Sequence, residues 1–407
     1  HSLKLFNLKY INAPVAYNTG FLDFINRRWK VRRISLKGLA CIALIFGLTT
    51  SAHADSALEL IKDIEVHGFA SSSYSYNFDQ PSDKSNRLRV YDFDDNSFKF
   101  DNAEIVLKKD AANIGDVGFR LDMTYGFSGP QTNKAGGGPS VGTTDVSDDD
   151  FDLQIAFVQY NAPIGNGLLI DFGKFATHIG AEVMDGYDGW NSNFSRSFLF
   201  NYGPFTHTGV RMQYALSDTV GLLGMISNGQ DNQTDTNAAK GFGGQVSWMA
   251  CDNITLLFNY FGSAEEQVNQ ANNSDDYRHF FDVVADISVT NKLSLNLNYV
   301  YGTEDNARGA GLDAQWWGFS GIARYDVNNW LSLNLRGQFF DDSDGFRSST
   351  VQQLASFTFT PEVRINNNMV VRAEYRHDDS SATPFIDRNT NPQDTQDTVA
   401  FNALFYF

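Results

Sequence analysis

Cysteine and proline are scarce in this sequence. Only two cysteines and nine prolines occur among its 407 residues, and Cys41 lies in an N-terminal segment that we expect to be removed. Cys251 would then be the only thiol of the mature chain. Because a disulfide framework needs paired cysteines, the stability of the mature chain must come from its size or from a closed sheet.

Basic residues are also in short supply. The 31 Lys and Arg residues stand against 48 Asp and Glu residues, and residues 1–54 hold eight of the basic residues and one of the acidic ones. The rest of the chain therefore keeps 23 basic and 47 acidic residues, a formal charge of −24. Nucleic-acid phosphates need a basic footprint, so this charge excludes nucleic acid as a partner.

Long apolar runs are missing except near the start. The one such run lies in "ISLKGLACIALIFGLTTSAHA", which follows a basic cluster and ends on Ala52-His53-Ala54. A basic stretch, an apolar core and a small-x-small end predict a secretory signal cleaved after Ala54. The alternative is an N-terminal membrane anchor, but the run is short for a spanning helix. We therefore expect 1–54 to be an N-terminal extension with a cleaved signal peptide, and 55–407 to be the mature domain.

Aromatic residues and glycine, in contrast, are abundant. With 34 Phe, 17 Tyr and 34 Gly, the composition favours strands and tight turns. Sixteen segments of roughly ten residues alternate apolar and polar side chains with the period of a strand. They are 64–78, 97–109, 114–126, 151–161, 167–175, 207–216, 219–228, 240–250, 253–262, 276–289, 292–301, 316–326, 329–340, 349–364, 369–377 and 397–407.

The connections between these segments alternate between short and long. Seven are tight turns with Asn, Asp and Gly, and eight are long and rich in Asp, Asn, Ser and Gly. Outer-membrane barrels have short periplasmic turns and long external loops. We therefore predict an all-β fold, a transmembrane antiparallel up-and-down β-barrel of about 16 strands. The long connections are 79–96, 127–150, 176–206, 229–239, 263–275, 302–315, 341–348 and 378–396.

A soluble, half-buried sheet would show the same alternation of side chains. Two features favour the membrane barrel instead. Charged residues such as Arg120 and Arg336 sit in the middle of strands on the polar face, as expected if that face lines water. Tyrosines and tryptophans gather at strand ends, like the aromatic belt at a membrane interface.

The chain closes on "DTVAFNALFYF", in which Phe401, Phe405 and Phe407 share one face of a strand. An exposed apolar edge strand invites aggregation, but in a closed barrel the last strand pairs with the first, near Val66–Phe78. We expect the three phenylalanines to face lipid. Phe407 would be part of the assembly signal that the barrel-assembly machinery recognises.

The stretch from residue 151 to residue 216 carries a family resemblance. It contains Gly173-Lys174-Phe175, Gly180-Ala181-Glu182, Asn193-Phe194-Ser195-Arg196-Ser197 and Thr206-His207-Thr208-Gly209-Val210-Arg211. These motifs, and more loosely "NSFKFDNAEIVLKK" and "GDVGFRLDMTYG", resemble the OmpL-like outer-membrane β-barrel porins of Gram-negative bacteria. The resemblance implies a channel in the bacterial outer membrane and does not name the solute that passes.

The polar faces of the strands predict the charges that line a pore. Equal numbers of carboxylates and arginines would point inward, and the longest connection, 176–206, mixes aromatic with charged residues. We expect this connection to fold into the barrel and narrow it, its carboxylates facing the late arginines across a narrow water passage; an ordered external lid is the alternative. The expected strand residues are Glu104, Asp122, Asp152, Asp282, Asp286, Glu374, Arg120, Arg211, Arg324, Arg336, Arg372 and Arg376, and those of the connection are Glu182, Asp185, Asp188 and Arg196.

Catalytic and metal-binding patterns do not assemble from the sequence. His178, His207, His279 and His377 lie on separate segments, and no Cys/His metal spacing occurs. We predict a porin that passes small polar solutes by passive diffusion, without a cofactor, in contact with outer-membrane lipid and lipopolysaccharide and able to form a homo-oligomer such as a trimer. A structural barrel that sheathes a partner protein and a barrel enzyme are the alternatives.

Overall fold

The fold is given by a computed structural model that describes residues 63–129, 150–235, 237–265 and 275–407. The expected signal segment 1–54 lies outside these residues, as do most of the connections 127–150 and 263–275. Within the described ranges, no helix has both the length and the apolar character needed to cross a membrane.

Sixteen antiparallel strands of the described residues close into one barrel, in which nearly every strand pairs with its neighbours in sequence. All sixteen predicted segments coincide with a barrel strand, so the predicted fold class is confirmed. The barrel strands are β1 (Glu65–Asn77), β2 (Ser97–Lys109), β3 (Val117–Gly126), β4 (Asp150–Ala162), β5 (Leu168–Ala176), β6 (Thr206–Ala215), β7 (Val220–Ser227), β8 (Gly241–Cys251), β9 (Ile254–Ala264), β10 (Tyr277–Ser288), β11 (Leu293–Glu304), β12 (Ala314–Asp326), β13 (Leu331–Asp342), β14 (Gln352–Arg364), β15 (Met369–Ser380) and β18 (Thr395–Tyr406).

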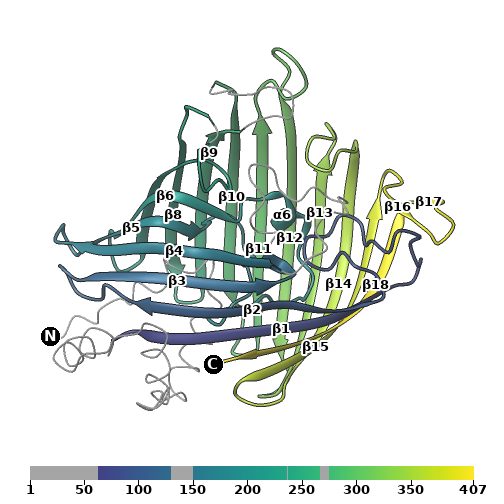
Figure 1. The fold of residues 1–407 in the computed structure, drawn as a ribbon, viewed down its shortest axis with the longest axis horizontal. Coiled ribbons are helices and arrows are strands. Elements are labelled where there is room, and N and C mark those ends of the chain that lie inside the picture. Colours follow the sequence, from purple (N-terminus) through teal and green to yellow (C-terminus); the bar gives the residue numbers. More distant parts are fainter. Residues whose placement is uncertain (1–62, 130–149, 236, 266–274) are drawn as a thin grey trace, which may run out of the picture.

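The connections between the barrel strands also contain short elements that are not part of the ring. β16 (Phe385–Ile386) and β17 (Pro392–Gln393) form a separate two-stranded sheet in the connection before β18. The short helix α6 (Phe198–Tyr202) belongs to the connection between β5 and β6. In Figure 1, strands β1 to β4 cross in front, β9 to β14 stand behind, and α6 lies between these walls.

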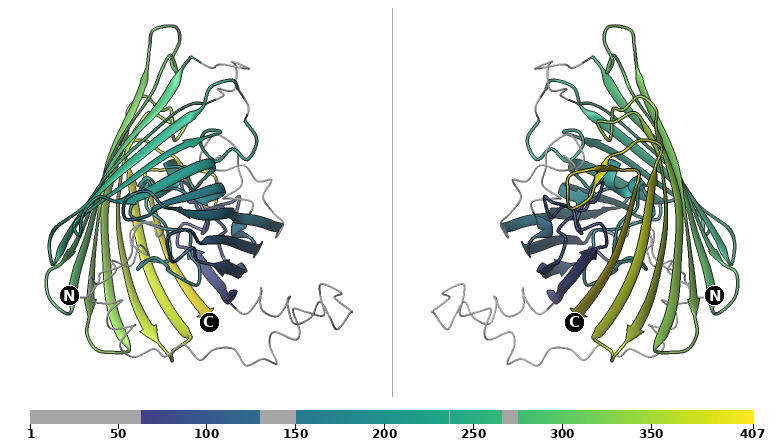
Figure 2. Two further views of the ribbon diagram at one scale, coloured as in Figure 1. Left: turned by 90° about the vertical axis from the view of Figure 1, so that its left-hand side faces the viewer. Right: turned by 90° about the vertical axis from the view of Figure 1, so that its right-hand side faces the viewer.

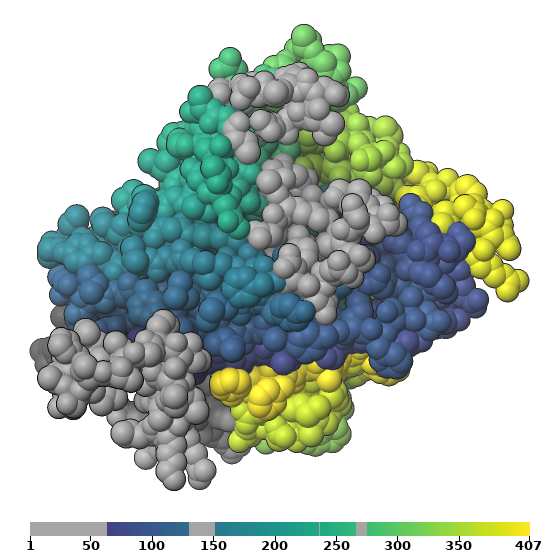
Figure 3. All heavy atoms as spheres, in the orientation of Figure 1, coloured from purple at the N-terminus to yellow at the C-terminus, as the bar shows by residue number. Residues whose placement is uncertain are grey.

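The barrel closes where the last strand meets the first. The register of β1 and β18 runs from Phe69 opposite Tyr406 to Asn77 opposite Thr398, which confirms the predicted pairing. Gly68 and Phe407 exchange two backbone hydrogen bonds of 3.0 and 3.1 Å. Figure 3 shows the purple first strand directly against the yellow C-terminal strand. No edge is left open there to pair with another chain.

The tight turns gather at one end of the barrel and the long connections at the other, as predicted (Figure 2). Local side-chain bonds shape the turns: the Asn328 side chain accepts hydrogen bonds from the amides of Trp330 and Leu331, at 2.9 and 3.0 Å. Gly115, with φ of +91°, supplies a backbone conformation in the β2–β3 turn that other residues rarely adopt.

The outer face of the barrel is apolar and exposed, as a lipid-facing surface must be. Tyr160, Trp248 and Tyr325 lie near the turn end of their strands, and Tyr125 and Trp317 near the loop end, which confirms the predicted aromatic belts. Between these belts, large apolar side chains are exposed around the ring, including Ile105, Val158, Phe172, Phe258, Phe281, Leu297, Phe319, Leu335, Phe357, Phe401 and Phe405.

A hydrophobic core lies inside the barrel, beneath the loop end of β9 to β14. Phe198, Leu199 and Tyr202 of α6 belong to this cluster. The Ser197 side chain caps α6 by accepting a hydrogen bond from the Phe200 amide. Burial of each large apolar side chain contributes roughly 1.5–3 kcal/mol, so this layer anchors the β5–β6 connection inside the ring. The strands contribute Phe261, Phe280, Val300, Trp316, Phe340 and Leu354 to it.

Candidate functional site

The connection between β5 and β6, residues 177–205, is hereafter called the crossing segment because it contacts opposite walls of the barrel. Its Gly180 amide donates to Asp282 of β10 at 3.1 Å, and its Tyr187 amide donates to Glu104 of β2 at 2.9 Å. Its Phe198 amide donates to Gln338 of β13 at 2.7 Å. Strands that are not neighbours in the ring therefore hold one stretch of backbone.

Glu374 of β15 binds the middle of the crossing segment. Its carboxylate accepts hydrogen bonds from the backbone amides of Phe194 and Ser195, at 2.6 and 2.9 Å, and from the Thr360 hydroxyl at 2.7 Å. Buried amides need such partners, because an unpaired one is costly. A wall carboxylate thus replaces the water that would otherwise solvate this backbone.

Arginines of the wall bind the carbonyl groups of the same stretch. Arg336 of β13 donates to the Ser195 carbonyl, Arg372 of β15 to the Asn191 carbonyl, and Arg376 of β15 to the Arg196 carbonyl, each at 2.6 Å. Charge-assisted hydrogen bonds of this kind are among the strong ones. The walls therefore hold both the donors and the acceptors of the crossing segment.

The tip of the crossing segment reaches the wall of β1 to β3 near the turn end. Tyr187 stacks on His67 of β1, with ring centroids 4.2 Å apart. Arg120 of β3 forms an ion pair with Asp188 at 2.8 Å and with Asp122 at 2.7 Å. Burial opposes ionisation of Asp188, but the Arg120 guanidinium outweighs it and holds the pKa of Asp188 below its usual value.

One expectation about these charges was wrong. The carboxylates of the crossing segment do not face the late arginines across water: Glu182 contacts Arg336 directly at 2.8 Å. Asp185 lies 3.0 Å from Arg196 and 3.5 Å from Arg372. The physical reason is desolvation, since a buried charge is stable only when its partner touches it.

Other expected residues pair within the wall instead. Asp188 contacts Arg120, an early arginine, and Arg324 contacts Glu362 at 2.9 Å and Asp326 at 3.1 Å, both on the strand wall. Arg211 of β6 pairs with Asp171 of β5 at 2.8 Å. The structure thus brings most expected residues to one interior, in several separate ion pairs.

Sequence reasoning missed part of the interior charge. Asp101 of β2 accepts hydrogen bonds from the hydroxyls of Ser71 and Ser73, at 2.9 and 2.6 Å. Asp378 of β15 pairs with Arg376 at 2.7 Å and with Arg89 at 2.7 Å. Glu362 lies on the polar face of the predicted strand 349–364, so the alternation of that strand could have identified it as an inward charge. Asp378, in contrast, lies one residue beyond the predicted end of its strand.

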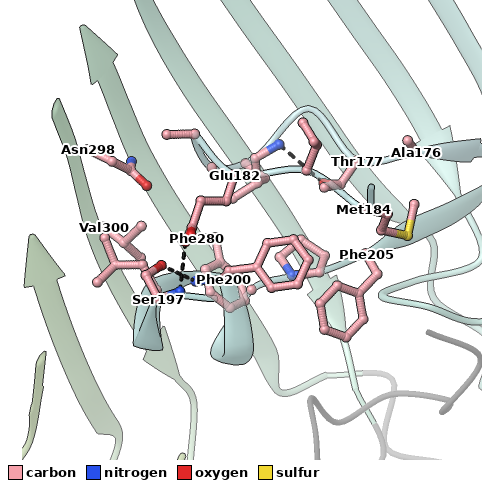
Figure 4. Close-up of a pocket in the computed structure, with 17 residues that line it drawn as sticks. Ala176, Thr177, Glu182, Met184, Ser197, Phe200, Phe205, Phe280, Asn298 and Val300 are labelled. Carbon is pink, nitrogen blue, oxygen red and sulfur yellow. Dashed lines mark hydrogen bonds between the residues drawn. The ribbon is translucent and has the colours of Figure 1, made fainter. Parts of the chain in front are cut away.

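Two recesses remain beside the crossing segment. One lies between its base and the strands β10 and β11, where Glu182 accepts a hydrogen bond from the Ser197 amide at 2.9 Å, and Phe280, Asn298 and Val300 line the wall (Figure 4). The other lies toward β1, β2 and β4 and has polar lining from Ser71, Asp101, Gln154, Asp185 and Arg196.

Two buried histidines of the described residues are held by hydrogen bonds. His178 bonds to the Tyr260 carbonyl at 3.0 Å, and burial lowers its pKa to about 4, which keeps it neutral. His207 contacts the Thr177 hydroxyl at 3.0 Å. In the part of the chain that the structure describes, no three His, Cys, Asp or Glu side chains are grouped so as to hold a metal ion.

A protein-family model matches most of this chain. The family model described as "Putative beta-barrel porin-2, OmpL-like" matches residues 63–407 of this chain. No curated protein sequence matches this chain.

Solved structures of outer-membrane proteins share the fold. An anion-selective porin from Comamonas acidovorans aligns with a TM-score of 0.58 and 10% identity, over 84% of this chain and 99% of that chain. The high-pH structure of OprB from Pseudomonas putida aligns with a TM-score of 0.56 and 12% identity, over 88% and 97%. The trimer form of in-vitro folded OmpT from Vibrio cholerae aligns with a TM-score of 0.55 and 11% identity, over 84% and 99%.

Proposed function

The chain belongs to the OmpL-like β-barrel porin family of the bacterial outer membrane, and we propose that its channel passes small hydrophilic solutes by passive diffusion and is narrowed by the crossing segment. Barrels of this family are typically non-enzymatic channels. The observation that carries the proposal is the contrast between an apolar outer face and a charged, hydrogen-bonding inner face on sixteen closed strands. A ring of this size leaves a lumen that strand side chains alone do not fill.

The crossing segment supplies the narrowing in this proposal. Its backbone is bonded to Glu104 of β2 and, on the other side, to Gln338 of β13 and Glu374 of β15. The polar recess between this segment and the β1, β2 and β4 wall is lined by two acidic residues, Asp101 and Asp185, and one basic residue, Arg196. Charged side chains that line such a passage favour polar solutes over apolar ones.

Planar-bilayer recording tests the proposal. Residues 55–407, refolded in detergent and added to a bilayer, should give discrete conductance steps, and sugar-loaded liposomes carrying the protein should swell in small sugars. A protein that folds to the barrel but never conducts would overturn the channel. Conductance that starts only after a bound protein is stripped away would point to a sheath around a partner.

We also propose that Phe407 belongs to the assembly signal. Its ring is 53% exposed at the end of the last strand, where it continues the lipid-facing series of Phe401 and Phe405. Deleting Phe407 should lower the yield of folded barrel in the outer membrane, as measured by heat-modifiable migration on gels, while the conductance of the molecules that do fold stays the same. A normal yield would contradict this role.

The oligomeric state and the processing site complete the proposal. One structural relative has a trimer form, and we propose a trimer of this barrel in contact with lipid and lipopolysaccharide. Mass measurement in detergent checks it, and a monomeric mass would contradict it. N-terminal sequencing of outer-membrane material should begin near Asp55 and would exclude a retained anchor.

A further inference from the structure

A group of buried oxygen atoms lies at the end of the crossing segment, outside the strands. Asp231 and Asn232, in the connection after β7, are each 3% exposed, and Glu265, which follows β9, is 0% exposed. Phe205 ends the crossing segment beside them. Three stretches of chain that are distant in sequence therefore meet at this point.

Each of the two carboxylates is held through one oxygen. Asp231 Oδ1 accepts hydrogen bonds from the amides of Phe205 and Thr206, at 2.7 and 2.8 Å. Glu265 Oε1 accepts hydrogen bonds from the Ser263 hydroxyl at 2.5 Å and the Gln230 amide at 2.7 Å. These bonds fix the position of both carboxyl groups.

The second oxygen of each carboxylate has no such bond. Asp231 Oδ2, Glu265 Oε2 and Asn232 Oδ1 are buried and accept no hydrogen bond from the described residues. Metal-binding carboxylates show this division, in which one oxygen is oriented by hydrogen bonds and the other is a ligand. Buried oxygens without a donor are rare in proteins, and an ion is one established cause.

Glycine geometry shows that the side chains of Asn232 and Glu265 lie close together beside Gly229. A Cβ atom built on Gly229 would lie 2.9 Å from Asn232 Nδ2 and 3.1 Å from Glu265 Oε1. Gly229 itself has φ of +123°, a conformation that favours glycine. The amide of Asn232 can present either its nitrogen or its oxygen after rotation about the last bond. Asp231 lies between Gln230, which bonds Glu265, and Asn232.

Charge points to a cation in this space. The charged groups that act on this space are the carboxylates of Asp231, Glu265 and Glu304 and the guanidinium of Arg278. Arg278 forms an ion pair with Glu304. Two negative charges are therefore in excess.

We propose that Asp231, Asn232 and Glu265 bind one divalent cation, with calcium as the preferred ion. Calcium takes several oxygen ligands from carboxylates and amides and tolerates irregular geometry, whereas magnesium demands a near-ideal octahedron. One such ion neutralises the two excess charges. It also joins the end of the crossing segment to the β7–β8 connection and to β9, so that binding holds the crossing segment in place at Phe205.

Isothermal titration calorimetry of the refolded barrel tests the proposal. The protein is refolded from inclusion bodies in a non-ionic detergent, because lipopolysaccharide phosphates bind calcium themselves, and is treated with EDTA before titration with CaCl2 at pH 7.5. We expect one saturable site with a Kd of about 10⁻⁴–10⁻³ M, the range of extracellular calcium modules. Magnesium should bind more weakly. No saturable heat, or equal affinity for both ions, would overturn the assignment.

Matched variants locate the ion. Asp231→Asn and Glu265→Gln should each weaken calcium binding about tenfold or more. Asp344→Asn removes another acidic residue from the long-connection end, where Asp344 pairs with Arg308, and should leave the affinity unchanged. If protons rather than an ion neutralise the site, the wild type will take up no calcium and both variants will be more stable than it in EDTA.

A second measurement does not depend on the variants folding. Hydrogen exchange of the wild-type amides of Phe205, Thr206 and Gln230, which bond the two carboxylates, should slow when calcium replaces EDTA. Unchanged exchange at these amides would contradict the proposal. Because none of these readouts measures conductance, they are independent of the channel function.

Discussion

Two walls of the same barrel differ in what covers them. On β13 and β15, the inward side chains of Arg336, Arg372 and Glu374 are buried against the crossing segment. On β8 to β11, toward the turn end, the inward side chains of Ser247, Asp286 and Asn296 are only half-buried. Both walls are built from the same alternation of polar and apolar residues, so strand patterning does not cause the difference. The connection between β5 and β6 causes it, which supports the proposal that this connection narrows the channel.

Replacing an arginine of the covered wall should have the largest effect. Arg336→Ala leaves Glu182 buried without its cation and the Ser195 carbonyl without its donor. Removing one partner of a buried ion pair costs about 3–5 kcal/mol. Asn296→Ala, on the less covered wall, loses one hydrogen bond to Asp286 and should cost only about 0.5–1.5 kcal/mol. Urea unfolding followed by tryptophan fluorescence compares them, and equal losses would remove the distinction between the walls.

A bulkier residue at the tip should have an intermediate effect. A Cβ atom on Gly186 would lie 3.0 Å from both carboxylate oxygens of Glu104, whereas one on Gly189 would meet nothing within 4 Å. Gly186→Val should therefore push the tip away from β2, cost about 1–3 kcal/mol and alter conductance. Gly189→Val is the matched control. If the two variants gave identical unfolding curves and identical single-channel conductance, the tip would not be held against β2.

Acidification should have a smaller effect, located at the tip. The pKa of Asp188 is lower in the folded chain than in the unfolded one, so its ion pair with Arg120 stabilises the fold above the ordinary aspartate pKa of about 4. That stability is lost as the pH falls through the folded pKa. The Asp188 side chain is 45% exposed, so solvent screening keeps the contribution modest. Asp188→Asn should be less stable than the wild type at pH 7 and equal to it in strong acid; a difference independent of pH would contradict this pairing.

The smallest effect should be on ion preference. Asp286, on the less covered wall, is half-buried, and Asp286→Asn should shift the reversal potential slightly toward anions. The shift should shrink near 1 M salt, where the Debye length is about 3 Å. Glu374→Gln removes a charge that is already engaged by the amides of Phe194 and Ser195, so it should change the reversal potential less. The opposite order would show that ions pass the covered wall.

The strands could be predicted from the sequence because each one satisfies a local rule. Alternation with period two marks lipid-facing and inward residues, and turn residues mark the ends, as at Asn328. Local rules fail where the register shifts. The register of β1 and β2 shifts between Ser71 and Ser72, so that Asp101 is the extra residue on β2, and Asp101 was missed as an inward carboxylate.

The contacts of the crossing segment could not be predicted in the same way. Its aromatic and charged composition indicated that it would hold one shape, but Glu182 finds Arg336 and Asp188 finds Arg120 only because the closed ring brings distant strands face to face. No spacing along the chain encodes such pairs. Desolvation then decided between direct contact and a water-filled gap, and the sequence offered no measure of burial at either place.

Single-channel recording of a shortened crossing segment tests the central claim most directly. Residues 185–194 are replaced by two glycines. The stretches on either side of this deletion are in contact, because Arg196 Nε lies 3.2 Å from the Val183 carbonyl and the Ser197 amide donates to Glu182. Deletion of 308–311 in the β11–β12 connection is the control. If the crossing segment sets the narrowest point, conductance should rise severalfold in the first variant and stay unchanged in the control. Unchanged conductance in a first variant that folds to the barrel would contradict the account.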